Sequence, residues 1–157
     1  MNHPETERSD GAQTTAKPTK RHRRAPAAKG RVRRVAVTLA LEAERGFAKA
    51  DATHLFARVA ATSPLPTGKL RAELIPDSSW KRARKTLGPQ ASQTAARLSH
   101  ILSIAERIWG NEKDATAWLN SPHAELEGAA PISLLRTEAG GRAVEALLAA
   151  LEFGFPV

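Results

Sequence analysis

A run of cations near the middle of this 157-residue sequence is the first group of side chains that could do chemistry. Guanidinium and ammonium groups bind phosphate oxygens and, in the DNA major groove, the edges of guanine bases. Hydroxyl groups at the start of a helix favour a phosphate at the same place. The sequence therefore predicts a DNA contact surface, with these candidate residues: Ser78, Ser79, Lys81, Arg82, Arg84 and Lys85.

These residues fall on the second of two short predicted helices, 67–74 and 78–87, which a turn containing Pro76 joins. That layout is typical of a helix-turn-helix, whose second helix enters the major groove. Trp80, Ala83 and Leu87 lie at spacings of three and seven and predict an inward face, which leaves most of the cations outward. The alternative interpretation is a solvated basic helix within a bundle.

The net charge of +8 is unevenly distributed along the chain. Residues 1–35 carry 10 basic and 3 acidic side chains, residues 66–97 carry 7 and 2, and residues 98–157 carry 4 and 8. Residues 1–34 hold almost no large apolar side chain, so we expect a disordered basic tail. Three interpretations of this tail are open. It is a solvated segment, or it results from a start codon assigned too far upstream, or it is an arm that binds DNA phosphates through Lys20, Arg21, Arg23 and Arg24.

The residues that enzymes use most often do not form a recognisable site. Cysteine is absent, which excludes disulfides and thiol chemistry. His54, His100 and His123 are far apart and lack repeated metal-ligand spacing, so we expect surface or partly buried histidines. No Walker loop and no GxSxG sequence is present. We predict no enzyme, no metal and no cofactor.

The elements that must position these residues are predicted to be helical throughout, giving an all-α fold. Alanine, the best helix former, occurs 30 times, and no segment alternates convincingly as a strand. No apolar run approaches the roughly 20 residues of a membrane span, and the start lacks a secretory core, so we expect a cytoplasmic protein. Besides the pair above, the predicted helices are 35–44, 49–61, 91–109, 112–120, 132–135 and 138–153.

The C-terminal third contains the most specific pattern. It begins with Trp118-Leu119, continues through Gly128 and Pro131 to Leu134-Leu135, and ends in the last predicted helix. This pattern resembles the toxin-binding domain of Xre/MbcA/ParS-type antitoxins. The resemblance extends back over the helix-turn-helix half and covers about 35–157.

The resemblance implies an antitoxin whose partner is a RES-domain toxin encoded next to it, with an ADP-ribosyltransferase-like fold that uses NAD. It implies that the C-terminal end covers the NAD pocket of the toxin, and that a homodimer binds operator DNA and represses its own operon. Glu152 is either a phosphate mimic for a toxin arginine or a surface charge, and Phe153 and Phe155 either insert into the toxin or pack within the fold. The candidate toxin-binding residues are Arg136, Arg142, Glu152, Phe153, Gly154, Phe155, Pro156 and Val157.

Two departures from the family pattern stand out, His123 after the proline and the doubled Gly140-Gly141. A second glycine inside a helix should cost about 1 kcal/mol. The predicted division is a tail over 1–34, a helix-turn-helix domain over 35–90 and a toxin-binding domain over 91–157. The alternatives are a stand-alone transcriptional regulator without a toxin, an inhibitor with a degenerate helix-turn-helix, and an RNA-associated protein.

Overall fold

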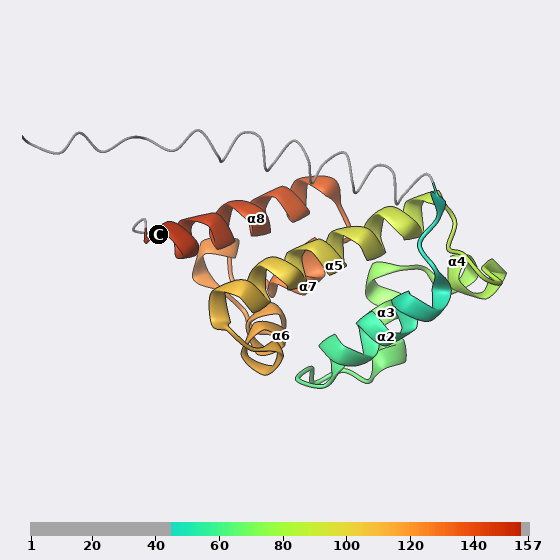
Figure 1. The fold of residues 1–157 in the computed structure, drawn as a ribbon, viewed down its shortest axis with the longest axis horizontal. Coiled ribbons are helices and arrows are strands. Elements are labelled where there is room, and N and C mark those ends of the chain that lie inside the picture. The colour runs from blue at the N-terminus through green and yellow to red at the C-terminus, as the bar shows by residue number, and fades with distance from the viewer. Residues whose placement is uncertain (1–44, 155–157) are drawn as a thin grey trace, which may run out of the picture.

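The computed structural model describes residues 45–154, and within that range the fold is all-α, as predicted (Figure 1). The predicted helix 35–44, the basic tail and the last three residues lie outside the described residues. Within the described range, no helix combines the length and apolar character needed to cross a membrane. The helices are α2 (Lys49–Ala60), α3 (Thr67–Leu74), α4 (Asp77–Arg82), α5 (Pro89–Trp109), α6 (Glu112–Asn120), the 3₁₀ turn η1 (Ala124–Leu126), α7 (Pro131–Leu134) and α8 (Glu138–Phe153).

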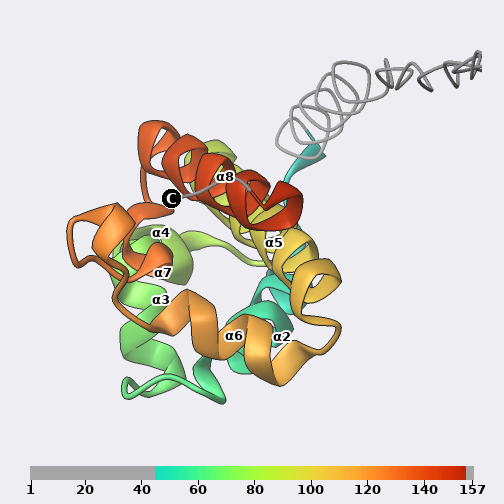
Figure 2. The same cartoon turned by 90° about the vertical axis from the view of Figure 1, so that its left-hand side faces the viewer.

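Helix α5 is the axis of the fold, and α6 and α8 pack along it (Figures 1 and 2). Apolar side chains spaced three and four residues apart form one stripe on this helix, and four of them, Leu98, Ile101, Leu102 and Ala105, are at most 1% exposed, as the period predicts. Ile108 and Trp109 continue the stripe and are only partly buried against the core. Proline at its first position and left-handed Gly110 at its end set the limits of this helix. Side chains from both sides of residue 90 belong to one core cluster. The division into a DNA-binding part, 35–90, and a toxin-binding part, 91–157, therefore stays a prediction about which partner each part binds.

Two further helices begin at side-chain caps. The Asn111 side chain accepts a hydrogen bond from the Asp114 amide at 2.8 Å and starts α6. The Thr137 hydroxyl accepts one from the Gly140 amide at 3.0 Å and starts α8. Each cap satisfies an amide that has no partner within its own helix. These caps fix the starts of the predicted helices 112–120 and 138–153, whose ranges are confirmed.

The predicted helix 78–87 is wrong in its second half. Helix α4 ends at Arg82, and Ala83 is already extended. The following segment pairs instead with the chain around the start of α2: the Lys49 amide donates to the Lys85 carbonyl at 2.8 Å, and the Leu87 amide donates to the Phe47 carbonyl at 2.9 Å. Leu87 therefore reaches the core, as its spacing predicts, but from an extended segment, so this half was not predictable from local periodicity.

The doubled glycine at the start of α8 has a packing reason. A Cβ on Gly140 would overlap the carbonyl oxygen of Leu134, and a Cβ on Gly141 would overlap the Arg97 side chain. The Arg97 side chain passes over Gly141, and its guanidinium donates to the Leu135 carbonyl at 2.6 Å. Burial lowers the pKa of Arg97 from its ordinary value, against the opposing charges of nearby carboxylates. The glycine pair thus allows α8 to approach α5 and α7 closely.

Candidate functional site

The C-terminal end of α8 carries exposed apolar side chains. Among the described residues the large hydrophobic side chains that are exposed are Leu151, at 39%, and Phe153, at 65%. Both belong to the last turn of a helix whose other large apolar side chains, from Val144 to Leu148, are buried. An exposed aromatic group beside an ordered core is typical of a contact surface for another protein.

Glu152 lies between these two residues and is already paired within the chain. Arg107 of α5 donates from Nε to one carboxylate oxygen of Glu152 at 3.2 Å and from Nη2 to the other at 3.0 Å. Sequence reasoning missed Arg107 because its partner is 45 residues away. Gly154 then ends the helix in the left-handed conformation. Phe155, Pro156 and Val157, which were predicted to continue this surface, lie outside the described residues.

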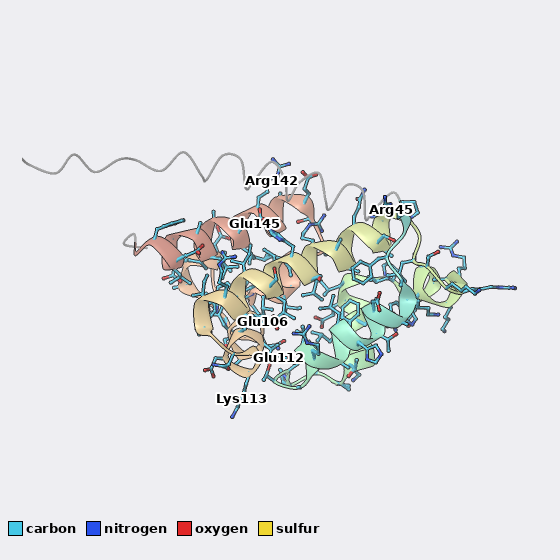
Figure 3. The ribbon with its side chains drawn as sticks, viewed as in Figure 1. Arg45, Glu106, Glu112, Lys113, Arg142 and Glu145 are labelled. Atoms are coloured by element: carbon cyan, nitrogen blue, oxygen red, sulfur yellow. The ribbon has the colours of Figure 1, made fainter. Side chains whose placement is uncertain are left out.

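The other two predicted toxin-binding residues lie toward the beginning of α8. Arg142 is exposed and pairs with Glu138 one turn earlier at 2.5 Å; it points outward from α8 in Figure 3. Arg136 precedes the helix and lines an open hollow of about 440 Å³. The remaining residues of that hollow are Glu73, Ser133, Leu134 and Thr137.

The predicted DNA-contact residues gather at the end of the molecule where α4 lies (Figure 1). The four cations are exposed, and within residues 45–154 none of them forms an ion pair with a carboxylate. Arg82 donates to the carbonyl of Ser78 at 3.2 Å, whereas Arg84 and Lys85 extend from the segment after the helix. Ser78 and half-buried Ser79 are in the first turn of α4, where Asp77 adds a negative charge.

Helix α4 has no fully buried side chain, so other contacts must hold it in place. The Trp80 ring meets Phe56 edge to face at 6.2 Å between ring centres, with Lys49 and Arg71 5.3 Å and 4.9 Å from the Trp80 centroid. Lys49 also donates to the carbonyl of Ala83, at the end of α4, at 2.8 Å. Aromatic and cation–π contacts therefore add to the partial burial of Trp80 against the core in holding this helix.

An ion pair fixes the beginning of the same helix. Arg71 pairs with Asp77 at 2.5 Å, and Arg71 also donates to the carbonyl of Ile75 at 3.2 Å. The hydrogen bond from Arg71, helped by its charge, holds the pKa of Asp77 below its ordinary value. Lys49 and Arg71 are thus engaged in positioning α4, which leaves the four exposed cations to face a ligand.

The three histidines in the described range make different structural contacts. His100 pairs with Glu145 of α8 at 2.8 Å, and Nε2 of His123 lies 3.0 Å from the Trp118 carbonyl oxygen. His123 also stacks on Trp118 at 4.9 Å between ring centres. His54 is exposed on α2. Within residues 45–154 no three residues of the metal-binding types come together in a group that could hold a metal ion.

Comparison with known proteins identifies a toxin-binding domain in this chain. Residues 105–154 match the family model of the antitoxin Xre/MbcA/ParS C-terminal toxin-binding domain. Over 109 residues, which are 66% of this chain and 70% of the relative, the chain is 34% identical to an antitoxin Xre of Yersinia enterocolitica. Over 59 residues, 38% of this chain and 37% of the relative, it is 32% identical to an antitoxin Xre of Pseudomonas putida. The matched domain includes the exposed end of α8 and the Arg107–Glu152 pair.

Proposed function

The chain belongs to the Xre/MbcA/ParS family of antitoxins, and we propose that it neutralises a RES-domain toxin through the C-terminal end of α8. As a family member with a toxin-binding domain, it is a toxin-neutralising antitoxin and not an enzyme. The proposed toxin is encoded by the neighbouring reading frame and uses NAD. The end of α8 from Phe153, with residues 154–157, covers its NAD pocket, and Arg136 and Arg142 add contacts near the beginning of the helix.

The observation that carries this proposal is the 65% exposure of Phe153 within the matched toxin-binding domain. Burying a phenylalanine side chain contributes roughly 1.5–3 kcal/mol, so an isolated protein gains little by leaving it in water. A hydrophobic pocket on a partner would recover that free energy. The aromatic ring also has the size and rigidity of the side chains that dominate protein interfaces.

Two substitutions at position 153 test this proposal in a binding titration with the purified product of the neighbouring reading frame. Phe153→Asp should weaken binding by about 30-fold or more, as expected for an interface hot spot, because a carboxylate would enter an apolar pocket. Phe153→Leu keeps the apolar volume and should retain most of the affinity. Equal affinity of Phe153→Asp and the parent chain, at unchanged thermal stability, would refute the proposed contact.

A second function, autorepression of the operon, is favoured by the four exposed cations at the α4 end of the molecule. We propose that a homodimer binds operator DNA there, with Lys81, Arg82, Arg84 and Lys85 on phosphates and base edges. Because Arg84 and Lys85 follow α4 in an extended segment, the contact surface combines a short helix with the chain after it. This surface and the end of α8 lie at opposite ends of the long axis, which leaves room for DNA and toxin together (Figure 1).

Charge reversal separates the two proposed surfaces. Lys81→Glu should weaken binding to promoter DNA and lower the salt dependence of that binding by about one ion for each phosphate contact removed, while leaving toxin neutralisation intact. Lys113→Glu is the matched control, since Lys113 is exposed on α6, away from α4 (Figure 3). Equal DNA affinity of the two variants would exclude the α4 surface. Loss of neutralisation in Lys81→Glu would contradict the separation of roles.

A further inference from the structure

A histidine–carboxylate contact and an ion pair join α5 and α8 along one edge of their contact, and they are spaced alike on both helices. His100 pairs with Glu145 at 2.8 Å, and Arg107 pairs with Glu152 at 3.0 Å. Each helix advances by seven residues from the first pair to the second, so the two helices run in the same direction along this edge. Figure 1 shows the same parallel course. The second pair lies where both helices end, beside the exposed Phe153.

The second pair engages the whole Glu152 carboxylate. Both of its oxygens accept a hydrogen bond from the Arg107 guanidinium, and the Glu152 side chain is only 32% exposed. Such a fork-shaped contact fixes direction as well as distance. A free carboxylate offered to an arginine of a partner would instead be exposed and unpaired. The geometry therefore argues against a phosphate mimic and for an internal anchor.

Local helix energetics do not explain a glutamate at this position. A negative charge in the last turn of a helix opposes the negative end of the helix dipole. Arg107 compensates this charge, and its own place in the last turn of α5 is the favourable one. Because neighbouring helical residues differ by about 100° in direction, fixing Glu152 against α5 also fixes the direction in which Phe153 projects.

From this geometry, and resting on the proposed toxin contact of Phe153, we infer that Arg107 is a positioning residue for the toxin-binding end. It holds Glu152 on α5, keeps the last turn of α8 helical and presents Phe153 to the toxin. Glu152 acts through Arg107 and does not itself contact an arginine of the toxin. The pair thereby preorganises an end that would otherwise lose conformational freedom on binding.

The test is a binding titration of the full chain with the purified product of the neighbouring reading frame. Four variants are compared with the parent chain: Arg107→Gln, Glu152→Gln, the double variant, and the exchanged pair in which Arg107→Glu is combined with Glu152→Arg. Each single variant should weaken binding by about two- to fivefold, the range of a partly exposed ion pair. The double variant should be no weaker than the worse single one, and the exchanged pair should recover most of the affinity. Arg58→Gln is the matched control, since Arg58 of α2 forms exposed ion pairs with Glu106 of α5 and with Glu112 of α6, the latter at 3.0 Å, neither of which involves α8, and it should not change the affinity.

A second measurement follows the last turn of α8 without any toxin. Hydrogen exchange of the amides of residues 150–154 should become faster in Arg107→Gln and in Glu152→Gln, and should return toward the parent rate in the exchanged pair. Protection that does not change in the single variants would overturn the positioning role.

The binding outcomes separate this inference from the proposed function. If Glu152→Gln weakens binding while Arg107→Gln does not, or if the exchanged pair fails to recover affinity, Glu152 contacts the toxin directly and the inference is wrong while the toxin contact stands. If neither single variant changes the affinity, the inference is also wrong. If the parent chain itself does not bind, the proposed function fails, and the inference fails with it.

Discussion

Gly141→Ala is a substitution for which helix propensity and packing predict opposite signs. Gly141 lies inside α8, where alanine is preferred over glycine by about 1 kcal/mol. The new Cβ, however, would overlap the Arg97 side chain, whose guanidinium is held by the carbonyl of Leu135 at 2.6 Å. Arg97 must move, and the hydrogen bond must lengthen or break.

The magnitudes decide the sign. A hydrogen bond from a charged group contributes about 1.5–3 kcal/mol, more than the propensity gain of about 1 kcal/mol. We therefore expect Gly141→Ala to lower the free energy of unfolding by about 0.5–2 kcal/mol, the difference of these two effects. In a chain of this length, each 1 kcal/mol lost lowers the melting temperature by about 2–4 °C.

Chemical denaturation of four variants tests this reasoning. In an Arg97→Ala background the space above Gly141 is free, so Gly141→Ala should there become stabilising. Gly68→Ala is the matched control, because Gly68 lies in α3 where an added Cβ would meet no atom within 4 Å, and it should also stabilise the fold. Stabilisation by Gly141→Ala in the parent chain, with Arg97 present, would refute the packing argument.

Three other predictions concern α6 and α4. Asn111→Ala removes the cap of α6 and should reduce the free energy of unfolding by about 1 kcal/mol, measured by denaturation. Because the pKa of Asp77 is lowered in the folded state, its ion pair with Arg71 stabilises the fold above the unfolded pKa, near pH 4, and this stabilisation is lost as the pH falls through the lowered folded pKa. Asp77→Asn should therefore be less stable than the parent chain at neutral pH, and the melting curves of the two proteins should converge in acid. Trp80→Leu removes the ring that Lys49 and Arg71 flank, so amides of α4 should exchange faster and DNA affinity should fall.

The helices that local signals define could be predicted from the sequence. The apolar stripe of α5 and its Gly110 end were visible in the residue order, and the limits of α8 were predicted as observed. In these helices the period of the apolar side chains and the capping residues act within a few positions of each other. The family membership inferred from the C-terminal pattern is also confirmed.

Features that depend on distant parts of the chain could not be predicted in this way. The spacing of Trp80, Ala83 and Leu87 suits a helix, but the backbone pairing of Leu87 with Phe47 forms across 40 residues and extends the segment instead. The role of Gly141 depends on Arg97, and that of Glu152 on Arg107, both on another helix. One signal for the second pair was present, because His100 and Arg107 are seven residues apart, as are Glu145 and Glu152. It becomes meaningful only once α5 and α8 are known to be neighbours.

The most direct test of the central claim is a rescue experiment in growing cells. The neighbouring reading frame is expressed alone, with the parent chain, and with Phe153→Asp, while growth and cellular NAD are followed. The account predicts that the neighbour alone stops growth and depletes NAD, that the parent chain restores both, and that Phe153→Asp does not. Full rescue by Phe153→Asp at equal protein level would contradict neutralisation through the end of α8, and a harmless neighbour would contradict the proposed toxin partner.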